Sequence, residues 1–230
     1  MNQRPDTVTV YADYVCPFCY LGYASFDRYQ DGREEPLTVE WHPFDLRASK
    51  RRPDGTIDHT VEDGTDETYF EEAKQNVRQL ADNYGVEMAQ ELAREVDSFP
   101  AQRAALRAQT DHPEAFDAFH RGLFDALWEA GRDISDPDVI AAVGSDAGLP
   151  EGSVAETLDD DGSADALEAA FDAARRDRIT GVPTFVSGER AARGAVSARA
   201  APAARGRCLR PPYRPSFERE MPTPPGVITS

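Results

Sequence analysis

Two cysteines separated by two residues, Cys16 and Cys19, lie between a strand-like run and a helix-like segment. The run at residues 7–12 (TVTVYA) alternates as a β-strand does. Pro17 suits the first position of the following helix because it has no N–H to lose there. Cys16 then falls at the helix N-terminus, where unpaired N–H groups and the helix dipole favour a thiolate. Cys19, one turn further, is placed to attack a mixed disulfide formed at Cys16, so the spacing predicts redox chemistry.

Two other uses of such a pair remain open. Half of a zinc site has this spacing, but a structural site usually needs a second cysteine pair or two histidines. Cys208 is far away along the chain, and the histidines show no ligand-like spacing; they are His42, His59, His112 and His120. A purely structural pair is the other alternative, and it is uncommon in reducing compartments. Redox chemistry is the favoured interpretation.

A second signal lies near the other end of the chain, at residues 180–186 (TGVPTFV). Proline just before an apolar run, preceded by Gly-Val, is typical of a turn that enters a strand. The pattern is weak on its own because many loops contain it.

Taken with the cysteine pair, this pattern makes the chain resemble the thioredoxin superfamily, and within it the DsbA-like oxidoreductases of the FrnE type. The matching stretches are residues 13–22 (DYVCPFCYLG), 39–46 (VEWHPFDL) and 181–185 (GVPTF), and the resemblance covers about residues 7–195. It implies an α/β, thioredoxin-like fold with a large all-helical insertion between its second and third strands. The expected domains are a two-segment thioredoxin-like unit (1–65 and 179–196) and a helical insertion (66–178).

The resemblance also implies roles for individual residues. Cys16 would be the attacking thiol and Cys19 the resolving thiol. Pro183 would follow a cis peptide bond and face the Cys16 sulfur, leaving the Val182 backbone to pair with an extended substrate. The remaining expected substrate-binding residues are Pro17, Phe18 and Thr184. Strongly oxidising DsbA proteins carry histidine at the position of Phe18, so we expect a less oxidising pair, with the direction of electron flow left open.

The net charge of the chain indicates which environment and which classes of partner to expect. Lys and Arg number 25 against 42 Asp and Glu, a net charge of −17, and only two of the basic residues are lysines. An acidic surface with scarce lysine and many alanines is typical of a halophilic, for example haloarchaeal, cytoplasm, where molar salt screens self-repulsion. An ordinary acidic protein is the alternative. Nucleic acid is not an expected partner because phosphate binding needs clustered positive charge, and the basic run at 47–53 is short and in an expected loop.

No apolar leader precedes the first strand and no run is long enough to span a bilayer, so we expect a cytoplasmic protein without a membrane partner. Neither a metal nor an organic cofactor is needed for exchange between thiols. The expected partners are protein or small-molecule thiols and disulfides.

Helical patterns are expected from about residue 66 to 178. Tyr69, Ala73, Val77 and Leu80 recur as one helix face. Further helices are expected over 87–95, 101–110, from Pro113 onward, over 137–147 and 151–158, and after Ser163 as an N-cap. His120, on the most apolar of these helices, and His42, on the second strand (37–43), are interpreted as satisfied structural histidines, since no nucleophile pairs with either.

The C-terminal stretch differs from the remainder. Residues 190–230 hold eight arginines against two acids, and seven of the 17 prolines. Residues 197–230 lack helical periodicity and exclude a regular helix. We consider two origins, a frameshift near residue 197 and a genuine basic extension that is disordered and binds an acidic partner.

The sequence therefore predicts a DsbA-family thiol–disulfide oxidoreductase with a Cys-Pro-Phe-Cys pair and a cis-proline loop. The first alternative is a glutathione-dependent isomerase or transferase of the 2-hydroxychromene-2-carboxylate isomerase type. The second is a non-enzymatic protein that binds clients in the groove beside Pro183.

Overall fold

The computed structural model describes residues 7–52, 55–58, 60–61, 67–89, 91–188 and 190–193. The expectations for residues 197–230, including Cys208, and for His59 lie outside these residues. None of the helices in the described part is both long enough and apolar enough to cross a membrane.

A four-stranded mixed sheet organises the fold, in the order β2-β1-β3-β4. Strand β1 (Thr7–Ala12) runs parallel to β2 (Thr38–Pro43) and antiparallel to β3 (Thr184–Ser187). Strand β4 (Arg190–Arg193) closes a hairpin with β3. Helix α1 (Pro17–Asp31) connects the two parallel strands, as the sequence predicted for residues 7–43.

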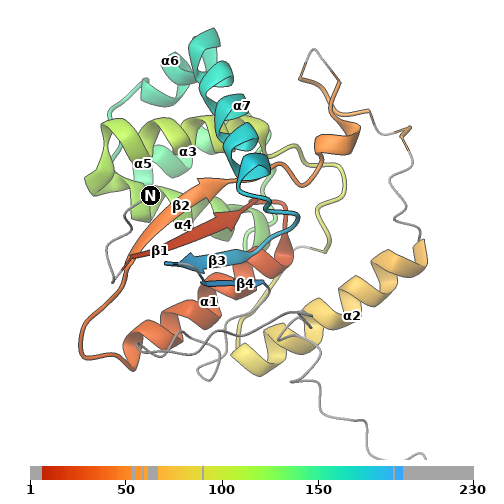
Figure 1. The fold of residues 1–230 in the computed structure, drawn as a ribbon. Helices are drawn as coiled ribbons and strands as arrows, with labels where there is room; N and C mark the ends of the chain where they lie inside the picture. Colours follow the sequence, from red (N-terminus) through yellow and green to blue (C-terminus); the bar gives the residue numbers. More distant parts are fainter. Residues whose placement is uncertain are drawn as a thin grey trace, which may run out of the picture.

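All remaining helices lie between β2 and β3 in the chain. They are η1 (Ala48–Lys50), α2 (Glu67–Tyr84), α3 (Phe99–Asp111), α4 (Pro113–Trp128), α5 (Pro137–Asp146), α6 (Ser153–Asp159) and α7 (Asp161–Arg176). Helices α3, α5, α6 and α7 gather on the β2 side of the sheet, whereas α2 lies beside α1 (Figure 1). The helical insertion is thus present between the second and third strands, and α7 packs against β2 as the chain returns to the sheet.

The core fills the space between the sheet, α1 and α4. Strand β1 is almost wholly buried, as expected for a central strand. Helix α4 contributes the largest share of fully buried apolar side chains, namely Phe119, Leu123, Leu127 and Trp128. A second, smaller cluster of Leu21, Val77 and Ala81 joins α1 to α2. Both clusters meet on α1, which carries the cysteine pair at its first turn.

Three local predictions were wrong. No helix forms in the described residues between 86 and 97: the Ala89 N–H donates to the Trp128 carbonyl at 2.9 Å instead of to a helical turn. The N-cap of α7 is Asp160, whose side chain accepts from the Gly162 N–H, while Ser163 lies inside the helix and donates to the Thr157 carbonyl. Tyr69 is 51% exposed, so the buried face of α2 begins further along, at Val77 and Ala81.

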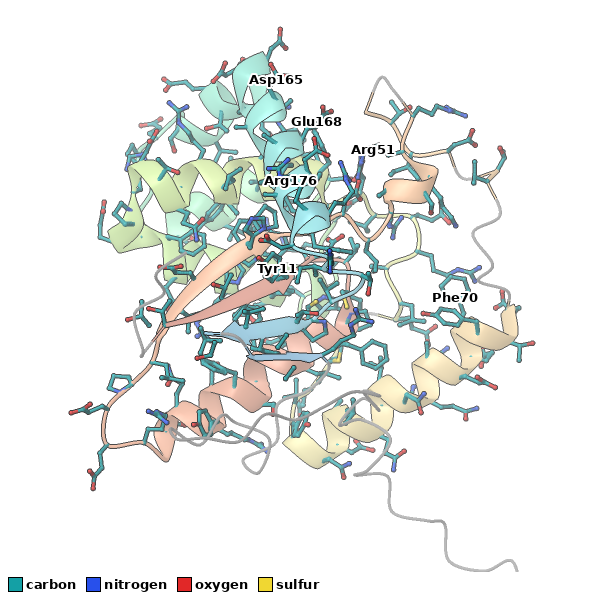
Figure 2. The ribbon with its side chains drawn as sticks, viewed as in Figure 1. Tyr11, Arg51, Phe70, Asp165, Glu168 and Arg176 are labelled. Carbon is teal, nitrogen blue, oxygen red and sulfur yellow. The ribbon has the colours of Figure 1, made fainter. Side chains whose placement is uncertain are left out.

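Charged side chains cover the outer surface of the helical part. Asp165 and Glu168 project from the outer side of α7 (Figure 2). Near η1, Arg51 is largely buried: it donates to Asp45 and to Asp97 and lies over the Phe99 ring, 4.7 Å from its centroid. This network fixes the loop after β2 against the start of α3.

Candidate active site

The cysteine pair occupies the first turn of α1. Cys16 is the N-cap, with extended backbone (φ −92°, ψ 110°), and Pro17 follows it in the first helical turn. The Cys16 N–H donates to the Asp13 carbonyl at 3.1 Å, and the Cys19 N–H donates to the Cys16 carbonyl at 3.0 Å. Both cysteines are free thiols and buried, with 2% and 0% of their surface exposed. The placement at the strand-to-helix junction is the one predicted from the sequence.

The loop that contains Pro183 meets this turn from the far end of the chain. The Val182–Pro183 peptide bond is cis, as expected. The Cys16 thiol points at the Val182 carbonyl, with Sγ to O at 3.8 Å, across a sequence separation of 166 residues. These segments meet because β1 and β3 are adjacent in the sheet. The Thr184 hydroxyl donates to the Gly181 carbonyl at 2.6 Å and so holds the loop from within.

Helix α1 comes very close to Pro183 through a glycine. A Cβ built on Gly22 would lie 3.1 Å from the Pro183 Cγ and 3.5 Å from the Phe185 ring. A side chain at this position would push the helix away from the proline loop. Gly22 therefore sets the distance between the cysteine turn and the loop that faces it.

Phe18 lies between the cysteines in sequence, but its side chain packs against the hydrophobic core. It packs with both core clusters and so reaches the residues of α2 and the loop after it. Pro17 is buried. Of the predicted site residues, the structure brings Cys16, Val182 and Pro183 into one contact region; for Pro17, Phe18 and Thr184 a substrate contact stays a prediction.

Cys19 lies in an environment that opposes its ionisation. Burial raises the pKa of Cys19 well above its usual value, and its hydrogen bond and electrostatic interaction with Cys16 raise it further. At neutral pH, Cys19 is therefore a protonated thiol and a poor nucleophile. This is the behaviour required of a resolving residue, which reacts only after its partner has formed a bond.

Asp13, at the start of the stretch 13–22, is a buried ionisable residue for which the sequence predicted no role. Its carboxylate is 1% exposed and accepts from three groups: Val15 N–H at 3.2 Å, Leu46 N–H at 2.8 Å and the Ser98 hydroxyl at 2.5 Å. Burial raises the pKa of Asp13 to about 6, and these hydrogen bonds limit the rise. Asp13 thus ties the cysteine turn to the loop after β2 and to the start of α3. In the sequence, the only indication of this role is an aspartate that directly follows an apolar strand.

His42 and His120 make their hydrogen bonds with groups other than the two cysteines. Burial lowers the pKa of His120 to about 3, and its Nδ1 is 2.7 Å from the Tyr14 hydroxyl. His42 has its Nδ1 3.1 Å from the Pro43 carbonyl oxygen and lies 4.7 Å from the Tyr11 ring. The expectation that both are structural residues agrees with these contacts, except that Nε2 of His120 has no protein partner in the described part.

A βαβ unit, an antiparallel hairpin, a cysteine pair at a helix N-terminus and a cis-proline loop opposite it define a thioredoxin-like protein. The model of the DSBA-like thioredoxin domain matches residues 7–201, and the chain belongs to this family. The uncharacterized protein YwbO of Bacillus subtilis is 30% identical over 205 residues, which cover 82% of this chain and 90% of that protein.

Solved structures of redox proteins and of an isomerase share the fold of this chain. The probable DsbA oxidoreductase SCO1869 of Streptomyces coelicolor is similar with a TM-score of 0.69 at 22% identity, covering 84% of this chain and 85% of that chain. A 2-hydroxychromene-2-carboxylate isomerase has a TM-score of 0.67 at 19% identity, covering 82% and 88%. The cytosolic disulfide reductase DsbM of Pseudomonas aeruginosa has a TM-score of 0.58 at 22% identity, covering 80% and 87%. These likenesses confirm the thioredoxin-like fold with a helical insertion.

Proposed function

We propose that this protein is a thiol–disulfide oxidoreductase in which Cys16 exchanges with a substrate disulfide and Cys19 resolves the intermediate. The observation that carries the proposal is the geometry of Cys16: a free thiol at a helix N-terminus, with its Sγ 3.8 Å from the carbonyl that precedes cis-Pro183. Cys19 follows one turn later as a second free thiol, so the pair can close to a disulfide.

The substrate would lie along the Val182–Pro183 loop. An extended segment can pair with the backbone there while its sulfur approaches Cys16. Pro17, Phe18 and Thr184 are the further residues proposed to contact it. The proposed substrates are protein or small-molecule thiols and disulfides. A solved structure of the disulfide reductase DsbM with GSH, a small thiol, has the same fold.

The 2-hydroxychromene-2-carboxylate isomerase reaction is the second candidate, because an isomerase with that name shares the fold. The two free thiols of the pair favour exchange over isomerisation, since isomerisation of a chromene acid with glutathione does not need a resolving cysteine. Turnover of a chromene acid with glutathione would support this second candidate. A client-binding role without catalysis predicts binding that survives the loss of both thiols.

We also propose four finer properties of this protein. They are the FrnE type, a haloarchaeal origin with a halophilic surface, a cytoplasmic location, and the division into 1–65 with 179–196 and 66–178. The net charge of −17 supports the halophilic interpretation, and the position of α2 to α7 between β2 and β3 supports the division.

Two serine substitutions test the proposed function. Cys16→Ser should abolish exchange with a disulfide because the attacking sulfur is gone. Cys19→Ser should leave the attack intact and accumulate a mixed disulfide on Cys16, visible as a mass increase of the intact protein. Full exchange activity in Cys16→Ser would refute the proposal.

A further inference from the structure

One step of the reaction proposed above is opposed by burial, and the backbone hydrogen bond from Asp13 to Cys19 offsets this only in part. To resolve the intermediate, Cys19 must become a thiolate while it is fully buried, and burial disfavours the charged form. Asp13, the carboxylate beside the pair, cannot assist as a donor: its oxygens already accept from Val15, Leu46 and Ser98, and its negative charge opposes a second one. A second neutral hydrogen-bond donor, in addition to the Asp13 backbone, would lower this cost further.

Tyr23 carries a hydroxyl of this kind on the same helix. It lies four residues after Cys19, so both side chains share one face of α1. Helical side chains lean toward the N-terminus, which directs the Tyr23 side chain back over the turn that holds Cys19. Tyr23 is 6% exposed, and its hydroxyl has no protein hydrogen-bond partner in the described part of the chain.

Three other hydrogen-bond donors near α1 and α4 already have partners other than Cys19. The Tyr14 hydroxyl is bonded to His120, the Trp128 indole N–H donates to the Tyr14 carbonyl at 2.9 Å, and the Tyr20 hydroxyl donates to Glu129 at 2.5 Å. The ring of Tyr23 is held edge-on against His120, with centroids 4.9 Å apart. An unpaired buried hydroxyl costs about 1–3 kcal/mol, so its retention calls for a reason.

The charges around Tyr23 agree with this role. Burial raises its pKa well above the usual value, and the largest effect of a neighbouring charge on it comes from Cys19. The other charges near its ring, Asp27, Asp117 and Arg121, form an ion-pair cluster in which Arg121 donates to both acids. Tyr23 therefore keeps its proton across the working pH range and can act as a donor.

We propose that the Tyr23 hydroxyl donates a hydrogen bond to the Cys19 sulfur as it becomes a thiolate, and so accelerates resolution of the mixed disulfide. The Cys19 sulfur attacks Cys16 Sγ, the Cys16–Cys19 bond forms, and the bond from Cys16 to the substrate sulfur breaks. The electron pair leaves on the substrate sulfur, which takes up the proton lost by Cys19, and Tyr23 retains its own. The inference rests on the proposed function.

The test is rapid-mixing kinetics with dithiobis(nitrobenzoate), an aryl disulfide that releases one coloured thiolate when Cys16 attacks and a second when Cys19 resolves. Tyr23→Phe should leave the first phase unchanged and slow the second about 10-fold or more, the effect of losing one hydrogen bond to a charged group. The apparent pKa of the second phase should also rise, a change that a packing defect would not cause.

Tyr20→Phe is the matched control, because it removes a hydroxyl from the same helix turn that is bonded to Glu129 instead. It should leave both phases at their wild-type rates. A second phase in Tyr23→Phe with wild-type rate and pH profile would overturn the role of Tyr23 while the proposed function stands. Absence of both phases in the wild-type protein would instead refute the proposed function.

Discussion

Asp13 illustrates how much a single buried side chain determines here. Its carboxylate joins three backbone segments that are distant in sequence and holds the turn from which Cys16 projects. Its pKa of about 6 is above the ordinary 3.8, so the folded protein binds a proton there that the unfolded chain has already lost between these values. The contribution of Asp13 to stability is therefore greatest at low pH and falls as the pH rises from about 4 through about 6.

Ser98→Ala should raise the pKa of Asp13 further, because the Ser98 hydroxyl is the strongest of the hydrogen bonds that favour the charged form. The stability deficit of the variant should then be larger at pH 7 than at pH 5, by about 1 kcal/mol for each unit of added shift. Titration of the Asp13 carboxyl carbon by NMR and denaturant unfolding at both pH values measure this. Ser135→Ala, which removes a serine hydroxyl bonded to exposed Asp133, is the matched control and should leave the Asp13 titration unchanged. An unshifted Asp13 titration in Ser98→Ala would contradict this reading of the site.

At the scale of an element, the C-terminal end of α7 places a residue with a side chain in a strained backbone conformation. Helix α7 closes with the Ile179 N–H bonded to the Ala174 carbonyl at 3.0 Å, and this return places Arg178 in the left-handed region at φ 60°. A side chain with a Cβ is disfavoured there, whereas glycine is not. Arg178 is exposed, so its side chain packs little against the remainder of the chain.

Arg178→Gly should therefore stabilise the protein by about 1 kcal/mol, while Arg178→Ala should change little because alanine has the same Cβ. The midpoint of denaturant unfolding measures both. A lower midpoint for Arg178→Gly than for Arg178→Ala would show that the left-handed residue carries no strain.

Much of the element order could be predicted because its signals are local. Prolines at the starts of α1, α4 and α5, the Asp136 cap and the alternation of β1 all act within one turn or one strand. The segment after Gly85 could not be predicted, since its backbone bonds to Trp128 and a helical pattern in sequence cannot reveal that partner. The roles of Asp13, Ser98 and Tyr23 depend on which groups surround them, and these come from separate elements.

The molecule as a whole brings two distant segments together around one sulfur. Residues 13–19 and 181–184 meet because the insertion leaves the sheet at β2 and returns to it at β3, beside β1 (Figure 1). The fold is shared with proteins named as an oxidoreductase and as an isomerase, so the fold alone does not decide the chemistry. We propose that the pair of free thiols opposite cis-Pro183 decides it in favour of thiol–disulfide exchange.

The central claim is tested most directly by redox titration of the Cys16–Cys19 pair against a dithiol buffer, in molar KCl so that this acidic chain stays screened. We predict one reversible two-electron transition that is lost in Cys16→Ser, and its midpoint potential would distinguish a reductase from an oxidase. The absence of a reversible transition in the folded wild-type protein would contradict the claim and favour the isomerase or client-binding alternatives.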